Sequence, residues 1–319
     1  MLLEIFILAI GLTVLIIGAN WLVEGASSVA LKLGVSAFTI GLTVVAFGTS
    51  LPELVVNIMS SVKGNSGLAI GNVVGSNSIN ILLIIGIAAV IKPVNVQSST
   101  VRIEIPFSLL AAVVLLVMAN KVLVDGAQES LLTRTDGMVL ILLLVVFLYY
   151  TFLSARSDSH APVSEVKGRK GYIVALMMVV GTLGLYFGGR MMVDSATKIA
   201  VSLGVSDSII GLTVLAIGTS LPELVTSCVA AFKGDSDIAI GNVLGSNIFN
   251  IFMVLGISSA ILPLPFYAEA NIDILVVCLA SVLLLIFALV GPGQKIDRRE
   301  GVLFVTIYLV YFAYLIIRS

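Results

Sequence analysis

Charged and reactive side chains are scarce in this sequence. Aspartate, glutamate, lysine and arginine make up 11% of the 319 residues, whereas soluble domains carry about 25%. There is one histidine, and the two cysteines, Cys228 and Cys278, both lie in apolar stretches. Cysteine there behaves as a small buried hydrophobe, so we expect no structural disulfide. The composition excludes an ordinary soluble domain, and the shortage of nitrogen and sulfur ligands argues against a zinc or copper site.

Apolar residues, by contrast, are abundant. They make up 59% of the chain, and the mean hydropathy is +1.17. A helix needs about 20 apolar residues to cross the hydrocarbon core of a membrane. We therefore expect an all-α polytopic membrane protein with ten transmembrane helices. The predicted spans are 2–22, 35–62, 67–91, 102–119, 136–154, 171–193, 207–232, 238–262, 271–291 and 301–317.

The distribution of basic residues predicts the orientation of these spans. Counting Lys and Arg, the loops after odd-numbered spans carry eleven and the other side carries six. Basic residues are enriched on the cytoplasmic side of membrane proteins. We therefore expect the loop from Arg156 to Lys170 to be cytoplasmic and both termini to lie outside, in a protein of the cell membrane.

The chain contains an internal repeat. A shift of 170 residues aligns Leu31–Asn80 with Val201–Asn250, and 30 of these 50 positions are identical without a gap. We predict a first five-helix repeat at 1–154, a cytoplasmic linker at 155–169 and a second five-helix repeat at 170–319. The most similar parts are 35–91 and 205–262. Because five is odd, the two copies enter the bilayer from opposite faces, an inverted topology that recurs in secondary transporters with a site near the midplane.

The motif GTSLPEL occurs at Gly48–Leu54 and again at Gly218–Leu224, inside apolar stretches. A glutamate at membrane depth is costly and by default indicates a functional site. The proline lacks an N–H and its ring clashes with the carbonyl four residues back. We therefore expect carbonyl oxygens at Ala46 to Thr49, and at Ala216 to Thr219, to lose their helical partners.

Each motif offers the same set of oxygen ligands. Besides backbone carbonyls there are two hydroxyls, from Thr49 and Ser50 or from Thr219 and Ser220, and one carboxylate. Calcium takes six to eight oxygen ligands of these kinds. Glu53 and Glu223 together would balance one divalent ion, which makes the loaded site tolerable in a low dielectric.

The span after each motif adds a polar stripe with a spacing of four. Residues four apart share a helix face. We expect the first amide of each stripe to make hydrogen bonds between packed helices and the deeper residues to join the site, while Asn57, Asn77, Ser227 and Asn247 remain open. The stripes are Asn72, Ser76 and Asn80 in the first repeat and Asn242, Ser246 and Asn250 in the second.

The doubled GTSLPEL, followed in each half by GNVxGSNxxN, resembles the alpha-repeats of the calcium/cation antiporter superfamily, and most closely prokaryotic sodium/calcium exchangers. The resemblance covers essentially the whole chain. It implies ten helices in two inverted five-helix repeats, transport of Ca²⁺ and Na⁺, and a first and a sixth helix that slide across the core. The ligands that it implies are Glu53, Glu223, Thr49 and Thr219 for calcium and Ala46, Ala216, Ser50, Ser220, Ser76 and Ser246 for sodium, with Asn80 and Asn250 lining the centre.

Asn80 and Asn250 are informative because some relatives of this kind carry aspartate at one of these positions. Two amides leave two core carboxylates, which speaks against potassium co-transport. Proton/calcium antiport remains the main alternative to sodium/calcium antiport, since two glutamates can carry protons. A channel lacks a repeated filter, and an enzyme lacks a His, Lys or Cys partner for the carboxylates. We expect no cofactor, no nucleic-acid partner and no obligate protein partner.

Overall fold

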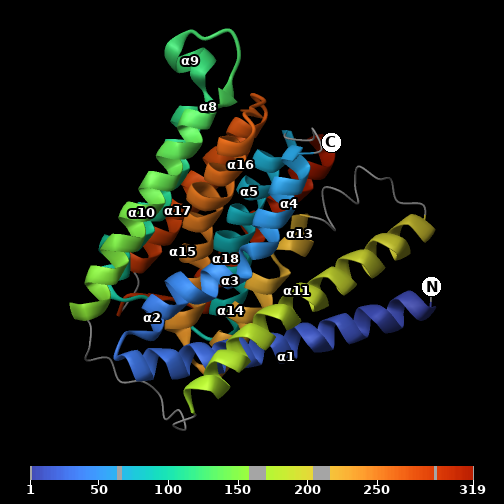
Figure 1. Ribbon diagram of the computed structural model, residues 1–319, viewed down its shortest axis with the longest axis vertical. Helices are drawn as coiled ribbons and strands as arrows, with labels where there is room; N and C mark the ends of the chain where they lie inside the picture. Colours follow the sequence, from blue (N-terminus) through green and yellow to red (C-terminus); the bar gives the residue numbers. More distant parts are fainter. Residues whose placement is uncertain (1, 63–66, 158–169, 204–215, 291–292, 319) are drawn as a thin grey trace.

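The computed structural model describes residues 2–62, 67–157, 170–203, 216–290 and 293–318, and these residues are almost entirely helical (Figure 1). The first half contains α1 (Leu2–Leu33), α2 (Ala37–Ile40), η1 (Gly41–Val45), α3 (Ala46–Thr49), α4 (Leu51–Val62), α5 (Gly67–Ser78), η2 (Ile79–Ile84), α6 (Ile85–Ile91), β1 (Val94–Asn95), α7 (Ser98–Arg102), α8 (Glu104–Ala119), α9 (Lys121–Asp125), β2 (Leu131–Leu132) and α10 (Arg134–Ser157). The second half contains α11 (Gly171–Ser202), α13 (Ala216–Thr219), α14 (Leu221–Lys233), α15 (Ser236–Phe249), η4 (Asn250–Leu255), α16 (Gly256–Ile261), β3 (Leu264–Pro265), α17 (Ala270–Val290), β4 (Lys295–Ile296) and α18 (Arg298–Arg318). The η segments are π-helical turns within longer helices.

Apart from the lengths of the first and sixth, the membrane spans in the described residues agree with the prediction from the sequence. The described residues contain nine helices that are long and apolar enough to cross a bilayer. The predicted span 207–232 begins outside the described residues, and its described part consists of α13 and α14. α14 ends in Lys233 and then Gly234, which has a left-handed φ of 84°. A glycine in this conformation directly after the last helical residue is a common way for a helix to end.

The first and sixth predicted spans end too early. α1 and α11 each contain 32 residues, or about 48 Å of helix, against a hydrocarbon core of about 30 Å. The predicted spans end at residues 22 and 193, next to the charged residues Glu24, Asp194 and Lys198. Helices of this length tilt and carry such charges beyond the hydrocarbon core, so the charges do not mark the helix ends. Figure 1 shows α1 and α11 side by side, running obliquely across the more upright helices.

Glycines allow the backbones of α1 and α11 to touch. A Cβ added to Gly18 would lie 2.8 Å from the carbonyl oxygen of Gly181, and one added to Gly188 would lie 2.8 Å from that of Gly11. In the repeat alignment Gly11 corresponds to Gly181 and Gly18 to Gly188, so each contact becomes the other when the two repeats are exchanged. The pair of helices therefore packs with the approximate twofold symmetry of the repeats, as small residues permit in membranes.

Each of several contacts between the two halves has an equivalent in which the halves swap roles, as inverted repeats require. The guanidinium of Arg134 donates to the carbonyl of Ile261 at 3.3 Å, and Arg298 donates to the carbonyl of Ile91 at 3.4 Å. Likewise β1 pairs with β4, and β2 pairs with β3. Because β1 precedes the start of α8 and β2 follows its end, the two ladders lie at opposite ends of that helix. This confirms the predicted inverted fold.

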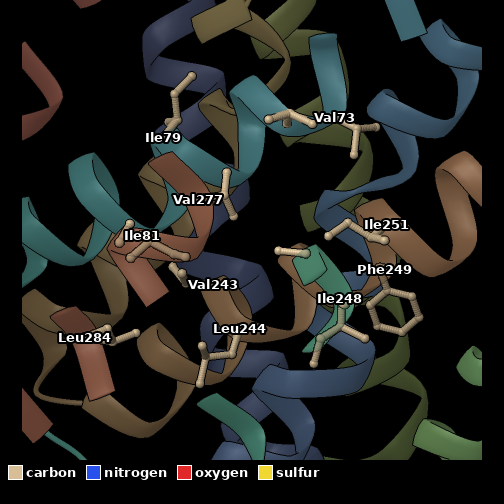
Figure 2. Close-up of a cluster of buried hydrophobic side chains, with 14 of the residues drawn as sticks. Val73, Ile79, Ile81, Val243, Leu244, Ile248, Phe249, Ile251, Val277 and Leu284 are labelled. Atoms are coloured by element: carbon tan, nitrogen blue, oxygen red, sulfur yellow. The ribbon is translucent and has the colours of Figure 1, made fainter. Parts of the chain in front are cut away.

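The core lies where α5–η2 and α15–η4 pass each other. Figure 2 shows buried apolar side chains of this core, among them Ile79 and Ile81 of η2 and Val243 and Leu244 of α15. Every residue from Ile238 to Gly256, the middle of the helix Ser236–Ile261, is buried, although the composition of this helix suits a membrane span. This helix is therefore enclosed by protein, and its polar residues face other helices. α10 ends at Ser157, and residues 158–169 lie outside the described part, so the linker at 155–169 stays a prediction.

Candidate functional site

A break in the helix positions each glutamate. In the first motif α3 ends at Thr49, Ser50 has φ −84° and ψ 1°, and α4 begins at Leu51. Pro52 lies in the first turn of α4, where its missing N–H costs no hydrogen bond. Glu53 therefore also lies in the first turn, near the positive end of the helix dipole. The second motif repeats this arrangement, with Ser220 at φ −88° and ψ 3° before α14.

One prediction about this break is wrong. We expected the carbonyl of Ala46 to lose its helical partner, but it accepts a hydrogen bond from the Ser50 N–H at 3.0 Å and another from the Thr49 hydroxyl at 3.3 Å. The helix does not open at Ala46 because the distortion is taken up before it, in the π-helical turn η1, and after it, at Ser50. Its counterpart Ala216 is the first residue of α13.

Both glutamates are fully buried. Glu53 and Glu223 each have 0% exposed surface, and they are close enough to repel each other electrostatically. Burying an ionised carboxylate is expensive unless it is paired. Two like charges in one enclosed place therefore require a positive charge, either a cation or protons.

Glu223 lies in a set of hydrogen-bonded side chains that we call the Glu223 half-site: Glu223, Ser50, Ser246 and Thr49. Its Oε1 accepts from the hydroxyl of Ser50 at 3.3 Å and from that of Ser246 at 3.5 Å. Thr49 and Ser246 share a hydrogen bond at 3.4 Å. Both Ser50 and Thr49 come from the first repeat, so this half-site joins the two repeats.

The repeat alignment defines the equivalent Glu53 half-site: Glu53, Ser220, Ser76 and Thr219. Neither oxygen of Glu53 has a hydrogen-bond partner among the described residues, and the same is true of the hydroxyls of Ser220 and Ser76. The Thr219 hydroxyl lies beside the Glu53 carboxylate, but its one hydrogen is donated to Oδ1 of Asn72 at 3.4 Å. Glu53, Ser76 and Ser220 are thus buried and Thr219 is half-buried, and the Glu53 half-site is joined by fewer hydrogen bonds than the Glu223 half-site.

The first amide of each polar stripe behaves as predicted. Asn242 accepts from the Thr49 hydroxyl at 3.0 Å and donates to the hydroxyl of Ser227 at 3.0 Å. Asn72 accepts from Thr219. These are hydrogen bonds between packed helices, as expected, and they orient the threonines beside the glutamates.

The two deeper amides, Asn80 and Asn250, meet two residues that the sequence left open. The Asn80 amide donates to Oδ1 of Asn247 at 3.0 Å, and the Asn250 amide donates to Oδ1 of Asn77 at 3.0 Å. Asn80 and Asn250 lie in η2 and η4, and π-helical turns are frequent at functional sites. Nothing in the sequence pattern indicates these turns.

Asn57 is a further buried polar residue that the sequence did not resolve. It lies one turn after Glu53, is 1% exposed, and its amide donates to the Glu53 carbonyl at 2.8 Å. Its counterpart Ser227 is also fully buried. The spacing of four from each glutamate was the available signal, since it puts both residues on the inward face of their helices.

The donors gathered here fit a hard cation. Among the described residues no group of three or more His, Cys, Asp and Glu side chains gathers to hold a metal. Two carboxylates surrounded by hydroxyls and amide oxygens are ligands of the kind that calcium and sodium prefer and that soft metals do not.

Inverted repeats with paired carboxylates at the helix breaks define an inverted-repeat membrane transporter. The chain belongs to the sodium/calcium exchanger protein family, whose model matches residues 3–153 and 173–317. It is 38% identical over 327 residues to the inner membrane protein YrbG of Escherichia coli, an alignment that covers 99% of this chain and 97% of YrbG. It is 32% identical to the sodium/calcium exchanger MaX1 of Methanosarcina acetivorans, with 97% of both chains covered.

A solved structure of the sodium-calcium exchanger NCX_Mj, soaked with Na⁺ and Sr²⁺, superposes with a TM-score of 0.83 at 33% identity over 98% of both chains. The protein is therefore a multi-pass membrane transporter of the cation/calcium exchange class.

Proposed function

We propose that this protein exchanges sodium for calcium across the cell membrane by alternating access. The observation that carries the proposal is the burial of Glu53 and Glu223, one from each inverted repeat, in one enclosed group of oxygen ligands. The names of MaX1 and NCX_Mj, which specify sodium and calcium, support the same pair of ions.

We assign the ligands as follows. Calcium binds to both glutamates and to the two threonines that accompany them, and sodium ions occupy overlapping positions. The full set is Glu53, Glu223, Thr49, Thr219, Ser50, Ser220, Ala46, Ala216, Ser76, Ser246, Asn80 and Asn250. All offer oxygen, through side chains or, for the two alanines, through backbone carbonyls. To bind an ion, the Ala46 carbonyl gives up the hydrogen bond that it accepts from the Thr49 hydroxyl.

Charge balance explains why the two ions exchange. Either one calcium ion or several sodium ions neutralise the pair of glutamates, and only a neutralised site passes an apolar barrier at acceptable cost. The ions therefore exclude each other at a shared site. If more than two sodium ions bind, the sodium-loaded protein carries net positive charge and transport is electrogenic.

The moving parts in this proposal are α1 and α11. They slide together across the core, and their glycine contact keeps them a unit. The other helices of the two repeats at 1–154 and 170–319 supply the core. The linker at 155–169 is cytoplasmic, and both termini lie outside. A cysteine introduced at each terminus and tested for labelling by an impermeant reagent on intact cells checks this orientation.

The test of the function is calcium uptake into proteoliposomes driven by an outward sodium gradient. Glu53→Gln and Glu223→Gln should each reduce uptake by at least about 100-fold, because half of the neutralising charge is lost. Glu24→Gln is the matched control, since Glu24 also lies in a long membrane helix but is 40% exposed and pairs with Lys233 at 3.2 Å. Wild-type uptake in either site variant contradicts the proposal.

Proton/calcium antiport is the second candidate, because two buried carboxylates can carry protons in place of sodium. The same vesicles distinguish the two functions. Calcium uptake driven by a pH gradient in the absence of sodium identifies a proton antiporter, whereas uptake that requires sodium at equal pH on both sides identifies a sodium antiporter.

A further inference from the structure

Four buried asparagines are hydrogen-bonded to one another between the repeats. Asn77, Asn80, Asn247 and Asn250 are each at most 1% exposed. Asn80 donates to the side chain of Asn247, and Asn250 donates to the side chain of Asn77. Asn77 also donates to the backbone carbonyl of Asn247 at 3.1 Å. Since Asn77 corresponds to Asn247 and Asn80 to Asn250, each central asparagine is held by the other repeat.

The hydrogen bonds fix which way the Asn250 amide points. A backbone carbonyl only accepts, so the atom of Asn77 that contacts the Asn247 carbonyl is its amide nitrogen. The remaining atom, Oδ1 of Asn77, can only accept, so Asn250 must offer its NH₂ group to it. Oδ1 of Asn250 is therefore the atom left over, and it is buried without a hydrogen-bond partner among the described residues. Asn80 likewise donates to Oδ1 of Asn247 and leaves its own Oδ1 unpartnered. The NH₂ group of Asn247 has no partner among the described residues, so the direction of the Asn80 amide rests on its equivalence to Asn250 in the repeat.

We infer that Asn77 and Asn247 are positioning residues that turn the amide oxygens of Asn250 and Asn80 toward the transported cation. The inference rests on the proposed function, because it concerns the same site. An asparagine amide has an oxygen that attracts a cation and an NH₂ group of similar size that repels it. An amide free to rotate would present the wrong end part of the time. Holding the NH₂ group makes both central amides oxygen ligands without adding a third negative charge.

The primary test is the Asn77→Leu variant of the full chain. The substitution removes the acceptor for the Asn250 NH₂ group and keeps a side chain of similar size. We expect calcium alone, titrated into purified protein without sodium, to bind about tenfold more weakly, the effect of losing one hydrogen bond of ordinary strength. Unchanged affinity overturns the inference. Asn247→Leu removes the acceptor for the Asn80 NH₂ group and should weaken calcium binding in the same way. This variant replaces Asn77→Leu if the latter does not fold.

Asn120→Leu is the matched control for the loss of a buried amide pair. Asn120 and Asn271 also join the two repeats through reciprocal amide hydrogen bonds, at 2.6 and 2.9 Å, but they lie at the end of α8. This variant should lower thermal stability and leave the calcium affinity unchanged. If it weakens calcium binding as much as Asn77→Leu does, the effect is one of general destabilisation and the inference fails.

A second background separates orientation from packing. In Asn250→Asp both terminal atoms are oxygens, so no partner is needed to orient them. Asn77→Leu should then cause no weakening of calcium binding in the Asn250→Asp background, and a tenfold weakening there overturns the inference. The proposed function is tested separately: if the wild type binds no calcium, or if Glu53→Gln binds it normally, the site assignment itself is wrong.

Discussion

The two half-sites contain the same residues but make different contacts. In the Glu223 half-site, hydroxyls from Ser50 and Ser246 both donate to the carboxylate. In the Glu53 half-site the equivalent hydroxyls, Ser220 and Ser76, are buried without hydrogen-bond partners among the described residues, as are both oxygens of Glu53. The sequence is symmetric here, and the conformation is not.

This difference fits a transporter built from inverted repeats. Such a protein passes between two states by exchanging the conformations of its halves around a fixed site. A structure of one state should therefore show two unlike half-sites made of matching residues. The bonded glutamate is stabilised by the protein, and the other depends more on a bound cation.

The difference between the two half-sites should have its largest effect on stability when each glutamate is neutralised in the absence of sodium and calcium. At alkaline pH Glu53→Gln should stabilise the protein more than Glu223→Gln, by about 1–3 kcal/mol, because Glu223 loses charge-assisted hydrogen bonds from Ser50 and Ser246 and Glu53 has no such bonds from Ser220 and Ser76. Chemical unfolding in detergent measures the difference. Equal effects, or a larger gain for Glu223→Gln, would show that the half-sites are alike in solution.

A region where the halves do match sharpens the comparison. Gly18→Ala and Gly188→Ala each place a Cβ 2.8 Å from a glycine carbonyl on the facing helix. Overpacking of this kind costs about 1–3 kcal/mol. We expect the two variants to lose equal stability in thermal unfolding, and both to slow exchange. If one variant lost clearly more stability than the other, the two repeats would differ throughout the molecule and not only at the half-sites.

The serines provide a smaller test. Ser246→Ala removes hydrogen bonds to Glu223 and Thr49 and should cost about 1 kcal/mol of stability without ions. Ser76→Ala removes a hydroxyl that has no partner among the described residues, so it should cost nothing under the same conditions. Both should weaken sodium binding in a titration. A stability loss in Ser76→Ala comparable to that in Ser246→Ala would contradict the assignment of contacts.

The ion pair between Lys233 and Glu24 should have the smallest effect. It joins α14 to α1 at 3.2 Å, with side-chain exposures of 30% and 40%. Partly exposed pairs contribute up to about 1 kcal/mol and are screened by salt. Lys233→Gln should therefore change stability slightly at low salt and not at high salt, as measured by thermal unfolding. A large, salt-independent loss would show that the pair is part of the core.

The sequence was sufficient for the features that depend on composition and on the repeat. Hydropathy placed the spans, and the shift of 170 residues paired Glu53 with Glu223 and predicted the inversion. Features that depend on tertiary packing could not be predicted. The π-helical turns, the retained partners of the Ala46 carbonyl and the lengths of α1 and α11 depend on neighbouring helices, and the unequal half-sites depend on a conformation that two nearly identical sequences do not specify.

The amides show how far residue spacing can be used. The spacing of four placed Asn72, Ser76 and Asn80 on one helix face, but Asn77 falls outside that pattern and remained open. Its role depends on contacts with Asn247 and Asn250, 170 and 173 residues away. Such contacts between repeats are invisible to a local pattern.

The central claim is that one pair of glutamates serves both ions in turn. Equilibrium binding of calcium to the purified protein, measured at increasing sodium concentration, tests it most directly. We predict one calcium ion per chain, displaced competitively by sodium with a dependence steeper than one sodium ion per calcium ion. Calcium binding that sodium leaves unchanged, or a second calcium ion that survives in Glu53→Gln, would contradict the account.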